Sequence, residues 1–119
     1  MDSILTSVKK LLGIDETYEH FDMDITMHIN MALSELLDLG VGPEEGYSIS
    51  DKNDEWTDFI EDGPLLSKVK DFVYLKVRLI FDPPASSAVM DSINKQIDKL
   101  EWKINVMVDP GKKEVKSNE

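Results

Sequence analysis

Residues 64–84, PLLSKVKDFVYLKVRLIFDPP, hold the densest apolar run in this chain and decide its fold class. At about 100° per residue, the apolar positions form two adjacent stripes that together cover about 200° of a helix surface. A helix on the surface of a domain buries a narrower arc, so this helix is predicted to be central, with neighbours on several sides. Pro83 and Pro84 end it, because proline lacks a backbone N–H and restricts the residue before it. The stripes consist of Leu66, Val69, Val73, Val77 and Ile80, and of Leu65, Phe72, Leu75 and Leu79.

Three further helices are predicted around the central one. The first spans about residues 3–12 and stops at Gly13, and the second runs from Asp22 or Asp24, either of which can cap it, to Leu39. The last begins at Ser86 or Ser87, and its apolar residues recur at intervals of three and four: Met90, Ile93, Ile97 and Leu100. We therefore expect a mainly α fold, a small four- to five-helix bundle formed by residues 1–111 as one domain, followed by a flexible charged tail, residues 112–119.

Residues 40–63 form an irregular acidic insert between the second and central helices. The insert is polar and rich in turn-forming residues, and it is interrupted by Trp56, Phe59 and Ile60. The spacing of these three residues predicts one or two helical turns that pin the insert to the core.

Residues 102–108 change the period of the pattern. Ile104, Val106 and Val108 alternate with polar residues or Met107 before Asp109 and Pro110, which predicts a short β-strand. The only internal partner for such a strand is the segment 47–50, so pairing with another chain is the sharper alternative. A helix that continues through Val106 is the third possibility.

The charge of the chain is strongly negative and unevenly distributed. The net charge is -11, with -13 in residues 1–62 and +2 in residues 63–119. A field of this sign repels nucleic acid and anionic membranes, and a single arginine offers little for phosphate or guanine contacts.

The absence of cysteine excludes disulfides, thiolate zinc sites and a cysteine nucleophile. With no signal peptide or membrane span in the pattern, we expect a soluble protein that binds neither DNA nor membranes.

Candidate metal and catalytic motifs are weak. His20, Asp24 and His28 fall four residues apart, but the second helix is predicted to begin after His20. Asp51, Asn53, Glu55 and Asp62 mimic the spacing of a calcium loop, yet Trp56 occupies the position that requires glycine. No phosphate-binding glycine loop, nucleophile elbow or dinucleotide motif is present. We predict no catalysis, no metal and no cofactor.

Two features of the helices indicate contacts with other subunits. Met23, Met27 and Met31 share a helix face opposite the core stripe, which favours a subunit interface, although burial under the 40–63 insert is equally compatible. Lys76 projects into the apolar arc of the central helix. Its stem can lie along apolar surface while its ammonium reaches water or a carboxylate, or it can form an ion pair at an interface.

The order of elements matches a known pattern: a short ILTSVKKLLGID helix, a long MALSELL helix, an acidic insert, a central helix closing in DPP and a last helix ending in WKINV. In this order and in its apolar pattern, over residues 3–108, the chain resembles the small head-tail connector (head-completion adaptor) proteins of long-tailed bacteriophages and prophages. The resemblance implies a helical, non-enzymatic virion protein, present in the host cytoplasm during assembly. It also implies a homo-oligomeric ring, dodecameric when assembled, that lies beneath the portal protein, extends the DNA channel and receives the next head-tail adaptor or tail-completion protein.

The resemblance gives these features expected roles. The acidic insert would line the channel with Asp51, Asp54, Glu55 and Asp58, because a negative wall discourages adhesion of the passing DNA. The methionines, Lys76 and the last helix would form lateral subunit contacts. The predicted strand, with Trp102, Ile104, Val106 and Val108, would dock on the portal or a neighbour by strand addition.

A different function class competes with this interpretation. The -13 charge of residues 1–62 could mimic DNA and inhibit a nucleic-acid-binding protein. Salt would displace such an inhibitor from a basic cleft, whereas a connector held by apolar contacts would depend less on salt.

Overall fold

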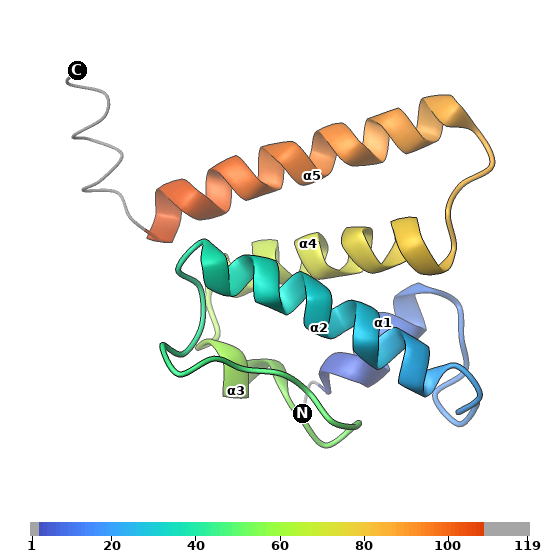
Figure 1. Cartoon of the computed structure of the whole chain (residues 1–119), viewed down its shortest axis with the longest axis horizontal. Coiled ribbons are helices and arrows are strands. Elements are labelled where there is room, and N and C mark those ends of the chain that lie inside the picture. Colours follow the sequence, from blue (N-terminus) through green and yellow to red (C-terminus); the bar gives the residue numbers. More distant parts are fainter. Residues whose placement is uncertain (1–2, 109–119) are drawn as a thin grey trace.

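The computed structural model of the chain describes residues 3–108, which form five helices and no sheet. Figure 1 shows α4 packed between α2 on one side and α5 on the other, with α1 and α3 at the α2 side of the molecule. The prediction of a mainly α fold is confirmed. The predicted tail, residues 112–119, lies outside the described residues. The helices are α1 (Ile4–Leu11), α2 (Asp22–Asp38), α3 (Trp56–Phe59), α4 (Pro64–Phe81) and α5 (Ser87–Val108).

Helix α4 is the central helix that its apolar arc predicted. Phe72, Val73 and Val77 have no exposed surface, and Leu65, Leu75 and Leu79 pack at the edge of the core. Ile80 is the exception, since it is 50% exposed although its position continues the buried stripe. It lies in the last turn of α4, shortly before Pro83.

Local signals set the ends of the first two helices. The Ser3 side chain accepts a hydrogen bond from the Thr6 N–H at 3.2 Å and so caps α1. Gly13 follows the C-terminus of α1 with φ of 82°, a conformation that glycine adopts without a Cβ penalty. Helix α2 begins at Asp22, but the prediction that Asp22 or Asp24 caps it is wrong, because Phe21 is the N-cap and no side chain makes a capping hydrogen bond.

The predicted strand 102–108 is wrong, because these residues form the last turns of α5. Their alternation spans too few residues to outweigh the helical seam, which continues from Ile93 and Ile97 through Leu100 to Ile104 and Val108. Ile104 is fully buried on this seam. Trp102 is 56% exposed, on another face. Inside a helix, each backbone N–H of this segment finds a carbonyl four residues back, so it needs no partner strand.

The segment 47–50, which the sequence suggested as the internal pairing partner of residues 102–108, already bonds to another part of the chain. Residues 47–50 belong to no helix or strand, and Ile49 is held by the side chain of Asn30 in α2. The Asn30 carbonyl oxygen accepts from the Ile49 N–H at 2.7 Å, and its amide donates to the Ile49 carbonyl at 3.0 Å. One side chain thus replaces the two backbone bonds that a neighbouring strand would supply.

None of the helices within residues 3–108 combines the length and apolar character needed to cross a bilayer.

Candidate interaction surfaces

Three methionines share the exposed face of α2. Met23, Met27 and Met31, hereafter the Met stripe, are 85%, 54% and 51% exposed. At about 100° per residue they lie roughly 180° around the helix from its buried stripe. Their exposure excludes the alternative that the 40–63 insert covers them, and leaves an adaptable apolar surface open to a partner. The buried stripe consists of Ile25, Ile29, Ala32, Leu33 and Leu36.

Lys76 joins two helices of the same chain. Its Nζ lies 3.0 Å from Oε1 of Glu35 in α2, and the two side chains are 28% and 44% exposed. The ammonium also lies 5.9 Å from the centre of the Phe72 ring. The lysine stem therefore follows the apolar surface and its head reaches a carboxylate, as one of the two sequence interpretations held. Its part in a subunit interface stays a prediction.

The acidic insert is anchored to the body of the protein by buried aromatic residues, as predicted. Trp56 and Phe59 of α3 are buried, and Ile60 packs at the edge of the core. The Trp56 indole N–H donates to the Ser7 hydroxyl of α1 at 2.9 Å. Gly42 lies against Phe59 so closely that a Cβ would come within 2.5 Å of the ring. The insert is therefore a fixed surface rather than a loose loop.

The four carboxylates assigned to the channel wall lie in one short segment, residues 51–58. Three of them also stabilise that segment by accepting backbone N–H groups: Asp51 from Asn53, Asp54 from Ser50, and Asp58 from Glu55. Asp58 and Glu55 form a reciprocal cap at the start of α3. Asp51 and Asp58 are exposed, whereas Asp54 and Glu55 are partly buried. The structure thus concentrates negative charge on a backbone that these same groups hold rigid.

Tyr47 faces this acidic segment without a hydrogen-bond partner for its buried hydroxyl. Burial, with the negative charges of Asp54 and Asp58 as smaller causes, raises the pKa of Tyr47 to about 12. The folded protein therefore keeps the phenol proton to a higher pH than the unfolded chain, whose tyrosines ionise near 10.

Replacement of Tyr47 by phenylalanine should stabilise the protein more at pH 11 than at pH 7. The Tyr47 contribution to folding is fully present below pH 10 and is lost as the pH rises towards 12, because only the unfolded chain gains from ionisation in that window. At pH 7 the change removes an unsatisfied hydroxyl and should be neutral or slightly stabilising. Urea midpoints of both proteins at the two pH values measure this, and an equal difference at pH 7 and 11 would contradict the expected pKa.

Lys9 ties α1 to the chain that leads into α2. The residue is 2% exposed, and its ammonium donates to the carbonyls of Glu16 at 3.0 Å and Tyr18 at 2.7 Å. Its third neighbour is the Asp22 carboxylate at 2.7 Å. Two donors of the ammonium thus bond to carbonyls and a carboxylate lies beside its charge, which is what a buried lysine requires.

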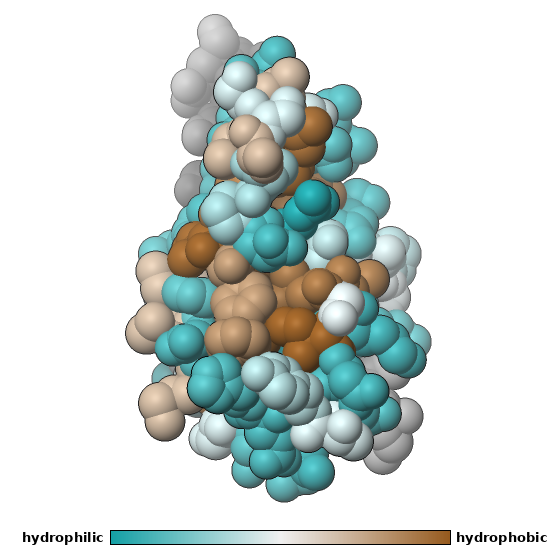
Figure 2. All heavy atoms as spheres, turned by 90° about the vertical axis from the view of Figure 1, so that its right-hand side faces the viewer, coloured by the Kyte–Doolittle hydropathy of each residue, from teal (hydrophilic) through white to brown (hydrophobic). Residues whose placement is uncertain are grey.

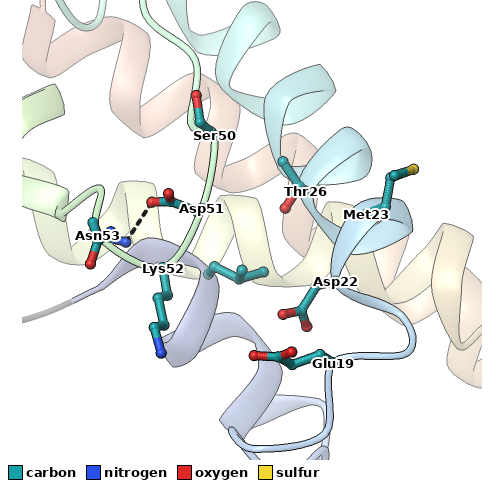
Figure 3. Close-up of a pocket in the computed structure, with 9 residues that line it drawn as sticks. Glu19, Asp22, Met23, Thr26, Ser50, Asp51, Lys52 and Asn53 are labelled. Atoms are coloured by element: carbon teal, nitrogen blue, oxygen red, sulfur yellow. Dashed lines mark hydrogen bonds between the residues drawn. The ribbon is translucent and has the colours of Figure 1, made fainter.

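A hollow of about 370 Å³ lies between the start of α2 and the acidic insert. Figure 3 shows the carboxylates of Glu19 and Asp22 side by side on one wall and Lys52 across from them, while Met23 points away. Asp22 is already paired with Lys9. The hollow is therefore an acidic recess beside the first residue of the Met stripe.

The weak metal motif of the sequence is not assembled. His20 precedes α2 and packs edge-on against the Phe21 ring at 4.8 Å, away from the helical turn that carries His28. Within residues 3–108, no three His, Asp or Glu side chains come together as a metal-binding group.

A second apolar area lies at one end of the molecule. Figure 2 shows hydrophobic side chains gathered in the middle of the end where α1 and α4 finish, rimmed by hydrophilic ones. Leu11 at the end of α1 and Ile80 at the end of α4 are 58% and 50% exposed. The surface of the molecule thus alternates apolar areas with charged rims, as expected of a protein that packs against others.

A comparison with known protein families identifies the family of this chain. The family model described as "Phage connector protein" matches residues 4–111, which include all five helices and the acidic insert. The chain belongs to the phage connector protein family. No curated protein and no solved structure matches the chain.

Membership of the phage connector family confirms the resemblance to head-tail connectors drawn from the order of elements. A phage connector is a structural protein of the virion and associates with other proteins of the phage head and tail. Family membership therefore indicates a structural role for this helical chain.

Two residues that organise these surfaces were not predicted from the sequence. Lys9 lies in a polar position of α1, and only its place beside the apolar Val8 hinted at burial. Asn30 occurs between apolar residues of α2, where a polar side chain signals a local partner. Neither signal identifies that partner, because backbone carbonyls and N–H groups are supplied by every residue type.

Proposed function

We propose that this connector assembles as a homo-oligomeric ring beneath the portal protein, extends the DNA channel and links the head to the tail. Family membership and the exposed Met stripe on the face opposite the core support the proposal. Three large apolar side chains in a row are costly to leave in water, and lateral contact between subunits would bury them. A dodecameric ring that receives the next adaptor or tail-completion protein on its far side fits this role.

The acidic insert is proposed to face the channel. Asp51, Asp54, Glu55 and Asp58 would present negative charge to the DNA phosphates and keep the passing duplex from adhering. Trp56 and Asn30 hold the insert in place, so the wall would keep its shape as DNA moves. Docking by strand addition is no part of this proposal, because residues 102–108 are helical.

Replacement of the Met stripe by glutamines, M23Q/M27Q/M31Q, should weaken ring assembly on portal rings about 100-fold or more. Complete burial of one methionine side chain contributes about 1.5–3 kcal/mol, and these three are already partly covered in the free subunit. Sedimentation velocity of the protein mixed with purified portal rings, at low and moderate salt, measures the assembly. The unmodified chain should co-sediment in stoichiometric amounts at both salt concentrations.

The matched control is Tyr18→Gln, since Tyr18 is 49% exposed, close to the 51% of Met31, but precedes α2 and lies outside the Met stripe. It should leave co-sedimentation unchanged. Circular dichroism checks that every variant is folded. A folded unmodified chain that fails to bind intact portal rings would refute the proposal, and salt-sensitive binding to basic clefts would then favour the DNA-mimic inhibitor.

A further inference from the structure

A basic face runs along α5 of this acidic protein. Lys95, Lys99 and Lys103 are exposed and lie four residues apart, so at about 100° per residue they share an arc of about 80°. The acidic residues of α5 fall outside this arc. Within residues 3–108, none of the three ammonium groups has an ion-pair partner. Unpaired cations of this spacing in a chain of net charge -11 suggest an acidic binding partner.

Lys99 and Lys103 border a groove between α4 and α5 of about 360 Å³, whose lining does not include Lys95. Its lining combines apolar and charged side chains: Asp71, Tyr74 and Leu75 from α4, and Lys99, Leu100 and Lys103 from α5. Leu75 and Leu100 pack at the edge of the core and supply an apolar floor. Asp71 is the single acidic group of this lining, so the lysines outnumber it.

The groove faces away from α2. Lys76 marks the side of α4 that meets α2, because it pairs with Glu35. Asp71, Tyr74 and Leu75 lie roughly 100–160° around α4 from Lys76. The Met stripe in turn lies about 180° from the buried side of α2. The groove and the Met stripe are therefore on different sides of one subunit, as two surfaces of a head-to-tail contact must be.

The Met stripe has the features that fit this groove. Its three methionines span about 12 Å along α2, and Lys99 and Lys103, which line the groove, span about 6 Å along α5. Asp24 is exposed on the same face of α2, between Met23 and Met27, and has no ion-pair partner within residues 3–108. An apolar stripe with an acidic residue at one end thus matches an apolar floor bordered by two lysines.

We propose that the α4–α5 groove receives the Met stripe of a second copy of this chain, with Lys99 and Lys103 beside Asp24 of that copy. This inference rests on the proposed ring, for which it names the two contacting surfaces. The contact is heterologous, so successive copies add in one direction and close when the rotation permits.

A charge exchange tests the pairing. Variant K99E/K103E carries an acidic groove, and variant D24K carries a basic residue in the Met stripe. Each alone should assemble on portal rings at least tenfold more weakly than the unmodified chain, because like charges then meet. An equimolar mixture should recover assembly, since each groove again meets a stripe of opposite charge. Asp24 lies in the first turn of α2, so circular dichroism checks that D24K is folded.

Control variant Lys10→Glu reverses an exposed lysine on α1, away from both the groove and the Met stripe, and it should assemble normally. If the unmodified chain binds portal rings but the reversed variants also bind, or their mixture does not recover, the groove assignment is overturned while the ring proposal stands. If the unmodified chain does not bind, the proposed function fails and the assignment with it. Loss of assembly in K99E/K103E but not in the stripe variant would indicate that the groove instead binds DNA phosphates or another acidic partner.

The absence of native cysteine permits a second, geometric test. Met27→Cys together with Gln96→Cys, which also lines the groove, should give a ladder of disulfide-linked oligomers after oxidation on portal rings. Each single-cysteine variant should give no ladder. Efficient dimers of M27C alone would instead show that two Met stripes face each other, and would overturn the heterologous contact.

Discussion

Replacement of Lys9 by alanine is expected to reduce the free energy of unfolding by about 3–5 kcal/mol. The change leaves the carbonyls of Glu16 and Tyr18 without their donor and removes the cation beside the Asp22 carboxylate. Breaking a buried ion pair from one side is costly because the remaining groups keep their desolvation penalty. A domain of this size has a stability of about 5–15 kcal/mol, so the loss should be visible as a large fall in the urea midpoint.

Lys10→Ala is the matched control, because Lys10 is the next residue of α1 and is exposed. It should change stability by no more than about 0.5 kcal/mol. Asp22→Asn should cost less than Lys9→Ala, since the ammonium keeps its two carbonyl acceptors and Asp22 is partly in contact with water. A Lys9→Ala protein within about 1 kcal/mol of the unmodified chain would show that the three contacts contribute little net energy.

Replacement of Trp56 by alanine is expected to cost about 3–5 kcal/mol and to detach the acidic insert. Trp56 is 1% exposed, its indole bonds to Ser7, and Lys70 lies 5.9 Å from its ring centre. Alanine leaves a cavity between α1 and α3 and removes these contacts. Urea unfolding measures the stability, and limited proteolysis between residues 40 and 63 measures the release of the insert.

Trp56→Phe separates the contribution of ring packing from that of the indole hydrogen bond to Ser7. It keeps most of the ring volume but loses the N–H donor to Ser7, so about 1 kcal/mol should be lost and the insert should stay resistant to protease. Equal protease resistance of the unmodified and Trp56→Ala proteins would mean that Asn30 and the other contacts hold the insert without the indole.

The mainly α fold was predictable because long amphipathic patterns leave few alternatives. The arc of α4, the caps of α1 and the glycine after it, and the aromatic turn of α3 each combine a period with a local end signal. The Met stripe was predictable as a second apolar face, but its exposure was not. Whether another segment covers a face depends on where the insert runs, and turn-rich segments carry no periodic pattern.

The end of α5 shows why a short pattern misleads. Over residues 103–108, alternation and a helical seam share the positions Ile104 and Val108, so the local pattern fits both. The tertiary structure resolves the choice: the seam that begins at Ile93 continues against α4, and Ile104 is buried there. A strand would have lost this burial and gained no pairing partner within the described chain.

The sequence by itself determined the helices, the central place of α4, the acidic insert and the order of elements that identifies a phage connector. These features follow from periodicity, capping and charge, which are properties of neighbouring residues. Only the tertiary structure decided the roles of Lys9 and Asn30, the internal pairing of Lys76 and the groove between α4 and α5. Such contacts join backbone groups and side chains far apart in the chain, and their energies depend on distances and burial that no local pattern contains.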